Sequence, residues 1–260
     1  MNIENLHRDL APERQKRVLE IIRQRNAVRV DELCEALSVS AATIRRDLEM
    51  LEAEGCIRRV HGGAVDGQAR LEEPLFDDKA GLAGTEKLGI ARLALAHIRE
   101  GDTIYLDGGS TILELARLLR DRSDITVVTN SLRAAVELAS AGPRLMLLGG
   151  EFRRRSQTIV GTMTRSLLET IYLDVAFMGT IGITEAGLTT TDPNEAFTKQ
   201  LVMTRARRVV LLADSSKIGK VSFAHAGALS DIGVLVTDGG ADPQFVKKIR
   251  KVGVTVEVAG

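Results

Sequence analysis

Five consecutive small or polar residues could hold an anion, because glycine lets the backbone approach a ligand and hydroxyl groups donate hydrogen bonds to it. They are Asp107, Gly108, Gly109, Ser110 and Thr111, placed between an apolar run at 103–106 and a helical pattern at 110–120. A helix that begins here directs its N–H groups and positive end toward the turn. A cation, Lys217, ends another polar turn at 214–217. These residue types predict a binding site for an anion such as phosphate.

The elements that must position this turn follow a regular rhythm. Apolar runs alternate with helical patterns, the runs at 103–107, 125–129, 144–150, 174–179, 208–214, 233–238 and 255–258, the helices at 86–98, 110–120, 131–139, 193–205 and 243–251. Continuous apolar strands interleaved with helices indicate a parallel sheet covered on both faces. Ligands of such sheets bind at the carboxyl ends of the strands.

Polar or glycine-containing turns follow several of these strands. Besides 107–111 and 214–217, strand ends carry Asn130 with its neighbours Thr129 and Ser131, Glu151 after Gly149 and Gly150, and Gly179. A single glycine-rich turn is more often a plain tight turn than a phosphate site. Five such strand ends in one sheet favour a binding site.

The first 65 residues have a different pattern. Apolar side chains recur at helical spacing within 13–25, 31–37 and 41–54. Asp31 and Ser40 are the predicted N-caps of the second and third helices, because their side chains can accept a hydrogen bond from the first turn. Two short helices with so brief a connection predict a helix-turn-helix, whose second member enters the DNA major groove.

The third helix carries the predicted DNA-contacting side chains. Burial of Ile44, Leu48 and Leu51 would leave an opposite face with two arginines, which can bind phosphate or fork onto a guanine edge. Small residues near the helix start would let the backbone approach the groove. The predicted contacts in and before this helix are Ser40, Ala42, Thr43, Arg45 and Arg46.

A basic hairpin is predicted after this helix. Gly55 would end the helix, and 56–65 would form a tight hairpin, or wing, from which Arg58, Arg59 and His61 project. A solvated basic face is the alternative interpretation. The two arginines of the preceding helix favour a role in DNA binding.

The combined pattern resembles a known family. The run 14–64 contains VSxxTIRRDL at 39–48, LExxG at 51–55 and RVHGGA at 59–64, and it resembles the DeoR family of bacterial sugar-catabolism regulators. The resemblance implies that Asp47 is structural, tying down the helix and neighbouring arginines, and that it does not read bases.

The region 85–258 resembles the DeoR C-terminal sensor domain, which is similar in fold to ribose-5-phosphate isomerase. The motifs are DGGST, TNS, GGE, DVAFMG and ADSSK. The resemblance implies that 107–111 hold the phosphate or polar head of an effector and that Lys217 faces the same pocket. Asn130, Glu151, Glu195 and Lys199 are carried over on less distinctive surroundings, and Gly179 ends the DVAFMG strand.

A catalytic role is the alternative to binding. The resemblance implies that the isomerases place two aspartates in an Asp-Gly-Ala-Asp turn, where this chain has Met178, Gly179, Thr180 and Ile181. Methionine and isoleucine cannot transfer a proton, so binding without turnover is expected. A sugar-phosphate isomerase-like enzyme with a DNA-binding head stays the alternative. Four scattered histidines and two cysteines predict neither a metal site nor a cofactor.

Composition bounds the partners and the location. The net charge is zero, and 1–65 contain eleven basic and eleven acidic residues, so any DNA contact depends on where the charges are placed. The chain shows neither a signal peptide nor a long apolar stretch, which predicts a cytoplasmic protein without a membrane partner.

The sequence predicts three parts. They are a winged helix-turn-helix of α+β type at 1–65, a linker at 66–85, and an α/β effector-binding and oligomerisation domain with a mainly parallel sheet at 86–260. The expected partners are double-stranded operator DNA, a phosphorylated sugar or polyol, and further copies of the chain in a dimer or tetramer. The predicted function is repression of a carbohydrate or polyol operon that the effector relieves.

Overall fold

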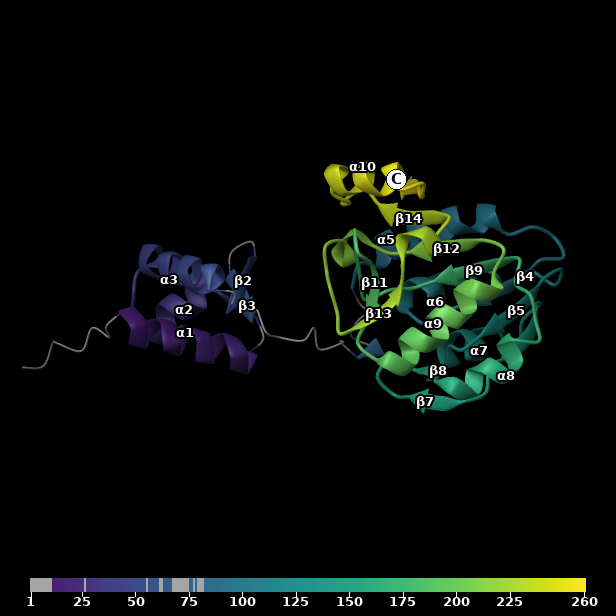
Figure 1. Ribbon diagram of the computed structural model, residues 1–260, viewed down its shortest axis with the longest axis horizontal. Helices are drawn as coiled ribbons and strands as arrows, with labels where there is room; N and C mark the ends of the chain where they lie inside the picture. Colours follow the sequence, from purple (N-terminus) through teal and green to yellow (C-terminus); the bar gives the residue numbers. More distant parts are fainter. Residues whose placement is uncertain are drawn as a thin grey trace, which may run out of the picture. The chain divides into compact units, whose positions relative to one another are not determined.

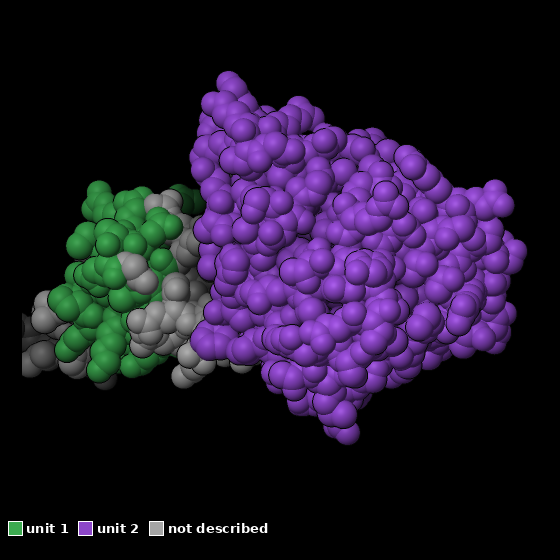
Figure 2. Space-filling model, turned by 45° about the vertical axis from the view of Figure 1, so that its right-hand side comes forward, with its two compact units in different colours: residues 1–70 green, residues 71–260 purple. Residues whose placement is uncertain are grey.

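A computed structural model of the 260-residue chain describes residues 11–25, 27–54, 56–60, 63–66, 75–76, 78 and 82–260. Within these ranges, the side chains of 23–25, 27, 58–60 and 65–66 are outside the description. The chain divides into two compact units, 1–70 and 71–260 (Figure 2). The linker boundaries at 66–85 stay a prediction, because most of that segment lies outside the described residues.

The first unit contains three helices and a small antiparallel sheet (Figure 1). The helices are α1 (Ala11–Arg25), α2 (Val30–Leu37) and α3 (Ala41–Ala53), and the strands β1 (Ala27–Arg29), β2 (Ile57–Val60) and β3 (Gly63–Asp66) have the order β1-β3-β2. Val18, Ile22, Leu33 and Ile44 are fully buried and form the core with Leu48. The predicted helices and hairpin are confirmed, and β1 adds a third strand.

The starts of α2 and α3 can be compared with the two predicted N-caps, Asp31 and Ser40. Ser40 is the N-cap of α3, and its hydroxyl accepts from the N–H of Thr43 at 3.3 Å, as predicted. The prediction for Asp31 is wrong, because Arg29 occupies the N-cap of α2 and Asp31 lies in the first turn. An acidic side chain there still interacts favourably with the positive helix end. Gly55, the predicted end of α3, lies outside the described residues.

The second unit is built on a seven-stranded parallel sheet with the order β15-β14-β12-β9-β4-β5-β6. The strands are β4 (Thr103–Leu106), β5 (Thr126–Thr129), β6 (Arg144–Leu147), β9 (Val175–Met178), β12 (Val209–Leu212), β14 (Val234–Asp238) and β15 (Thr255–Ala259). Buried strand side chains pack on both faces, which explains why the strands read as continuous apolar runs.

Helices cover both faces of this sheet. Apolar residues of α5 (Gly84–Ala94), α6 (Ser110–Leu118) and α7 (Leu132–Leu138) form one core layer with the strands, and those of α8 (Arg165–Leu168), α9 (Pro193–Arg205) and α10 (Pro243–Lys251) join the other. The predicted α/β domain with a mainly parallel sheet is confirmed. Within the described ranges, no helix combines the length and apolarity needed to cross a membrane.

Two smaller β elements were not predicted. β7 (Glu151–Arg153) and β8 (Thr158–Val160) form an antiparallel hairpin, and β10 (Gly182–Thr184), β11 (Gly187–Thr190) and β13 (Ala224–Gly227) form a second antiparallel sheet. These strands have three or four residues each and include threonine, glycine and charged side chains. They lack the apolar runs by which the long sheet was recognised.

The strand order reverses between β4 and β9. From β4 the chain continues outward through β5 and β6, whereas β9 continues in the opposite direction through β12, β14 and β15. The two neighbours stay in contact beyond the last paired residues, because the N–H of Asp107 donates to the carbonyl of Phe177 at 3.0 Å. A crevice at such a reversal is the usual ligand site of an open parallel sheet.

Candidate functional site

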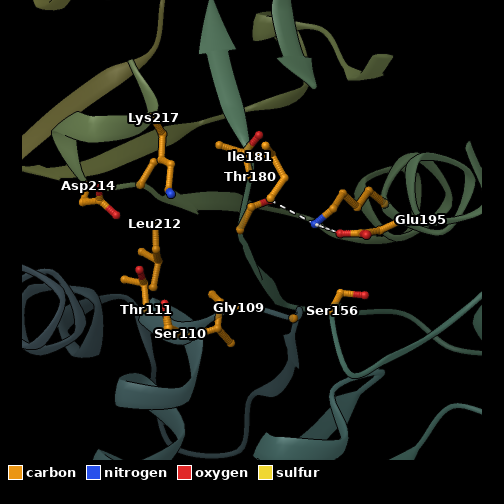
Figure 3. Close-up of a pocket in the computed structure, with 15 residues that line it drawn as sticks. Gly109, Ser110, Thr111, Ser156, Thr180, Ile181, Glu195, Leu212, Asp214 and Lys217 are labelled. Atoms are coloured by element: carbon orange, nitrogen blue, oxygen red, sulfur yellow. Dashed lines mark hydrogen bonds and ion pairs between the residues drawn. The ribbon is translucent and has the colours of Figure 1, made fainter. Parts of the chain in front are cut away.

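A pocket lies at the carboxyl ends of β4, β9 and β12 (Figure 3). Its empty space, together with the open solvent at its mouth, is about 570 Å³. The lining residues are Gly108, Gly109, Ser110, Thr111, Ile112, Ser156, Gly179, Thr180, Ile181, Glu195, Lys199, Leu212, Ala213, Asp214 and Lys217.

One side of the pocket is the start of α6. Gly109 is its N-cap and has a φ of 127°, which a residue with a side chain rarely adopts. The N–H groups of the first helical turn have no acceptor within a helix. Ser110 and Thr111 add their hydroxyls and are 9% and 8% exposed. This turn therefore offers converging hydrogen-bond donors to an anion.

The close approach of two glycines shapes the floor. A Cβ on Gly179 would lie 2.7 Å from the carbonyl oxygen of Gly108, and a Cβ on Gly108 would lie 2.2 Å from Cγ2 of Thr158. Either contact is shorter than real side chains allow. Both positions therefore need glycine to bring β4, β9 and the β7–β8 hairpin together.

A cation faces the start of α6 from the end of β12. Asp214 caps the short 3-10 helix Ser215–Lys217, accepting from the N–H of Ser216 at 3.0 Å and from its hydroxyl. Figure 3 shows Lys217 and Asp214 on the side of the pocket that holds Ser110 and Thr111, with Glu195 on the other side. The pocket thus has an end rich in donors and an end with a carboxylate.

Beneath the carboxylate end lies a network of opposite charges. Nζ of Lys199 donates to Oδ2 of Asp107 and, at 3.0 Å, to the carbonyl of Gly179. Oε1 of Glu195 is 3.7 Å from the same Nζ, and its Oε2 is 3.4 Å from Nη1 of Arg153. Arg153 also pairs with Asp192, the N-cap of α9, at 3.3 Å. Lys199, Asp107 and Glu195 are 3%, 1% and 6% exposed, so pairing is what makes their burial tolerable.

Some polar atoms of this region are buried without a hydrogen-bond partner among the described residues. They include Oδ1 of Asp107, Oδ1 of Asn130 and the hydroxyl of Tyr105. Burial, together with the negative charges of Asp107 and Glu195, raises the pKa of Tyr105 well above 10.0. Its hydroxyl therefore stays neutral and able to donate at any physiological pH.

The structure places the predicted effector-binding residues in three groups. Those that line the pocket are Gly108, Gly109, Ser110, Thr111, Gly179, Glu195 and Lys217. Asp107 and Asn130 are buried and do not line it; Asp107 pairs with Lys199, and Nδ2 of Asn130 donates to the carbonyl of Ile159 at 3.1 Å. Glu151 is exposed on β7 and does not belong to the lining.

Several lining residues were not among the predicted ones. Asp214 lies in the ADSSK motif, so the turn that predicted Lys217 contained the signal for it. Lys199, which the resemblance carried over together with Glu195, also lines the pocket. Ser156 had no signal, because the β7–β8 hairpin was not predicted. The apolar lining residues Ile112 and Leu212 lie in a predicted helix and a predicted strand, where apolar side chains indicate core.

The predicted DNA-contacting residues lie on and before α3. Ser40, Ala42, Arg45 and Arg46 are exposed, and half-buried Thr43 shares a hydrogen bond of 2.9 Å with Ser40. Arg58 and Arg59 lie in β2, with side chains outside the description, and His61 is outside the described residues. Helix α3 therefore presents two arginines to solvent, as a reader helix requires.

Asp47 has the structural role that the resemblance implied, with a different partner. It is 2% exposed and accepts from Nε and Nη2 of Arg14 on α1 at 2.6 and 3.0 Å and from Gln15 at 3.2 Å. These contacts join α3 to α1, whereas the resemblance implied contacts with the neighbouring arginines. Arg45 and Arg46 thus stay on the outer face of the helix.

Within the described ranges, no three or more histidine, cysteine or acidic side chains lie together in a way that could hold a metal ion. The charged groups of the pocket are Glu195 and Lys199 on α9, and Asp214 and Lys217 in the turn after β12. Their arrangement can hold a polar, negatively charged small molecule.

Known proteins give the same division of the chain. The DeoR-like helix-turn-helix domain matches residues 14–67, and the DeoR C terminal sensor domain matches residues 83–239. A ribose 5-phosphate isomerase A from Methanocaldococcus jannaschii is similar over 51% of this chain and 53% of its own, with 22% identity and a TM-score of 0.38, a likeness too distant to carry a statement about chemistry.

Full-length relatives are transcriptional regulators. The HTH-type transcriptional regulator GlpR of Haloferax volcanii is 38% identical, covering 95% of this chain and 97% of its own. The HTH-type transcriptional repressor GlcR of Bacillus subtilis is 32% identical, covering 95% of each chain. The putative aga operon transcriptional repressor of Escherichia coli O157:H7 is 32% identical over 95% of this chain and 94% of its own. With a helix-turn-helix domain and a sensor domain in this order, the chain belongs to the DeoR family of DNA-binding transcriptional regulators.

Proposed function

We propose that this regulator represses a carbohydrate or polyol catabolic operon and leaves its operator when a phosphorylated sugar-type effector occupies the pocket at the ends of β4, β9 and β12. The observation that carries the proposal is that Lys217 and the start of α6 line the same pocket. The names of the relatives, which include a lactose phosphotransferase system repressor of Staphylococcus epidermidis, support the carbohydrate part.

The donor-rich end is suited to the phosphate group. The first N–H groups of α6, the hydroxyls of Ser110 and Thr111, and the ammonium group of Lys217 would surround its oxygens. Glu195 and Ser156 at the other end can exchange hydrogen bonds with the hydroxyl groups of a sugar or polyol. The two ends together favour a small phosphorylated metabolite over a bare anion.

The DNA-binding unit would act as one of a pair. A single reader helix contacts one half-site, and two-fold related copies place two such helices one turn of DNA apart. We therefore propose a homo-oligomer, a dimer or a tetramer, that binds double-stranded operator DNA. Because the protein must reach the chromosome, we propose a cytoplasmic location.

Turnover is not part of the proposed function. Both carboxylates of the pocket lining are engaged, Glu195 by Lys199 and Arg153, and Asp214 by the N–H and hydroxyl groups of Ser216. Asp107, buried beneath the pocket, accepts from Lys199 and from the N–H of Gly179 at 3.0 Å. Met178 and Ile181, at the end of β9, cannot transfer protons. Glu195 nevertheless lines the pocket, and a carboxylate can transfer a proton. A measurement of sugar-phosphate turnover therefore decides between the sensor and the enzyme alternative.

Thermal shift tests the effector part. Ribose 5-phosphate, glucose 6-phosphate, fructose 1-phosphate and glycerol 3-phosphate are compared with inorganic phosphate and with the free sugars and polyol. A compound present at ~100 times its Kd adds about 2.7 kcal/mol of stability, and we expect this only for a phosphorylated sugar or polyol. If free sugars stabilise the protein equally, the proposed phosphate end is wrong. Because the chain has no tryptophan, calorimetry or an external dye gives the signal.

A further inference from the structure

The turn between β7 and β8 forms part of the pocket wall and has a constrained backbone. Ser156 is buried and lines the pocket, and its hydroxyl shares a hydrogen bond of 2.7 Å with that of Thr158. Gln157, between them, has a φ of 55°, in the left-handed region that favours glycine. Another residue keeps such a backbone only where surrounding contacts hold it there.

Helix α7 supplies those contacts. Nε of Arg133 donates to the side-chain oxygen of Gln157 at 2.5 Å, and the N–H of Leu132 donates to the Gln157 carbonyl at 3.0 Å. The first turn of α7 therefore holds the residue that follows Ser156. A shift of this turn relative to α7 changes both hydrogen bonds.

Arg133 also contacts the N-terminal segment of the second unit, which follows the DNA-binding unit in the sequence. Its guanidinium carbon lies 5.5 Å from the ring centroid of Phe76, an arrangement in which cation and ring attract. Phe76 is 2% exposed, although it lies between the end of β3 at Asp66 and the start of α5 at Gly84. One side chain thus contacts both the pocket turn and the N-terminal segment of the second unit.

We propose that Arg133 is a positioning residue that couples effector occupancy at Ser156 to the seating of Phe76, and thereby to the DNA-binding unit. The inference rests on the proposed function, in which an effector hydroxyl meets Ser156. When the effector displaces the turn, the Arg133–Gln157 hydrogen bond is altered and the guanidinium group over Phe76 moves with it. By thermodynamic linkage, if the effector changes the equilibrium for burial of Phe76 by some factor, burial of Phe76 changes the affinity for the effector by the same factor.

The first test uses Arg133→Met in the full chain, which keeps an unbranched apolar stem and removes the guanidinium group. The DNA is the duplex that the wild-type protein selects from a random library, and the probes are the four sugar and polyol phosphates named above. Wild-type operator affinity is expected to fall about 5- to 150-fold with the active probe. Arg133→Met is expected to bind probe and DNA separately within ~3-fold of wild type while the probe changes its DNA affinity less than ~3-fold.

Two further variants separate coupling from damage to α7. Arg120→Met removes an arginine that contacts α7 through Glu137 at 3.1 Å, so it is expected to keep the wild-type response. Arg133→Lys retains a cation that can donate to Gln157 and lie over Phe76, and it is expected to restore part of the response. A lost response in Arg120→Met would mean that any disturbance of α7 uncouples the protein, and would overturn the specific role of Arg133.

A second readout follows Phe76 itself. Since the chain has no tryptophan, the Phe76→Trp variant places a single tryptophan at this position, and its emission can be excited separately from that of the two tyrosines. Its emission is expected to shift when the active probe is added and to stay constant when Arg133→Met is also present. An equal shift in both proteins would overturn the proposed route.

The outcomes for the proposed function and for the coupling are distinct. A wild-type protein that keeps its operator at saturating concentrations of every probe contradicts the proposed function. A responsive wild type together with a fully responsive Arg133→Met variant contradicts only the coupling. Loss of probe binding in Arg133→Met also contradicts it, because Arg133 would then belong to the binding site.

Discussion

The two units use charge in opposite ways. Arg45 and Arg46 of α3 lie exposed in solvent, while the sensor buries Lys199, Asp107 and Glu195 within one network. A DNA surface brings its own opposite charge, so exposed arginines need no partner before binding. A small effector offers few contacts, so its site must be preorganised, with most of its charges paired in advance. This comparison predicts different consequences for charge removal in the two units.

Removal of the two exposed arginines is expected to have the largest effect. Arg45→Ala with Arg46→Ala should weaken operator binding by about 2–6 kcal/mol, at about 1–3 kcal/mol for each base or phosphate contact, and leave thermal stability and effector binding unchanged. Fluorescence anisotropy with labelled operator measures the loss. The control, Arg165→Ala with Arg207→Ala, removes two exposed arginines of the sensor. Equal losses in both double variants would show that overall charge, and not α3, binds the DNA.

Within the DNA-binding unit, a buried and an exposed ion pair can be compared directly. Asp47→Ala leaves the half-buried guanidinium group of Arg14 without its carboxylate, and breaking such a pair costs about 3–5 kcal/mol. Asp31→Ala removes the exposed partner of Arg29 and should cost about 0–1 kcal/mol. Denaturant unfolding followed by helix circular dichroism measures both. Similar values for the two variants would contradict the structural role given to Asp47.

In the sensor, Lys217 is the cation that faces the start of α6. Lys217→Ala should weaken effector binding by about 1.5–3 kcal/mol, the usual contribution of a hydrogen bond to a charged group, and leave operator binding without effector intact. Calorimetric titration with the active probe gives the value, and Lys248→Ala, which removes an exposed lysine paired with Glu185, is the control. Unchanged effector affinity in Lys217→Ala would show that the phosphate group does not bind at this end of the pocket.

The smallest expected effect concerns the backbone at the floor of the pocket. Gly179→Ala places a methyl group 2.7 Å from the carbonyl oxygen of Gly108, and such overpacking typically costs about 1–3 kcal/mol. Gly149→Ala has no neighbour within 4 Å of the added methyl group and serves as the control. Scanning calorimetry of the sensor transition compares them. A Gly179→Ala variant as stable as Gly149→Ala would show that β4 and β9 separate without cost.

The sequence predicted the two units unequally. In the first unit, the predicted DNA-contacting arginines and the core residues lie on one helix. The helical period that predicts burial of Ile44 and Leu48 therefore also predicts that Arg45 and Arg46 are exposed. In the second unit, apolar runs predicted all seven parallel strands, and residues of three of the five polar strand ends line one pocket. The same patterns could not say which strand ends meet, because this depends on the order β12-β9-β4-β5. Glu151 was therefore predicted at a pocket that it does not line.

The parts that sequence reasoning missed arise from contacts between distant segments. Ser156 reaches the pocket because the β7–β8 hairpin packs on Gly108, and Asp47 pairs with Arg14 from another helix. Neither contact leaves a local period or motif, since each depends on side chains more than 30 residues apart. The contact between Phe76 and Arg133 is likewise formed by residues far apart in the sequence.

The most direct test is a titration of the operator complex with each sugar and polyol phosphate, in which DNA release and the phosphorus spectrum of the added compound are followed in one sample. We expect one compound to release the DNA and to remain chemically unchanged through many equivalents. Conversion of that compound over multiple turnovers, or an operator complex that none of them dissociates, would contradict a sensor that binds without catalysis.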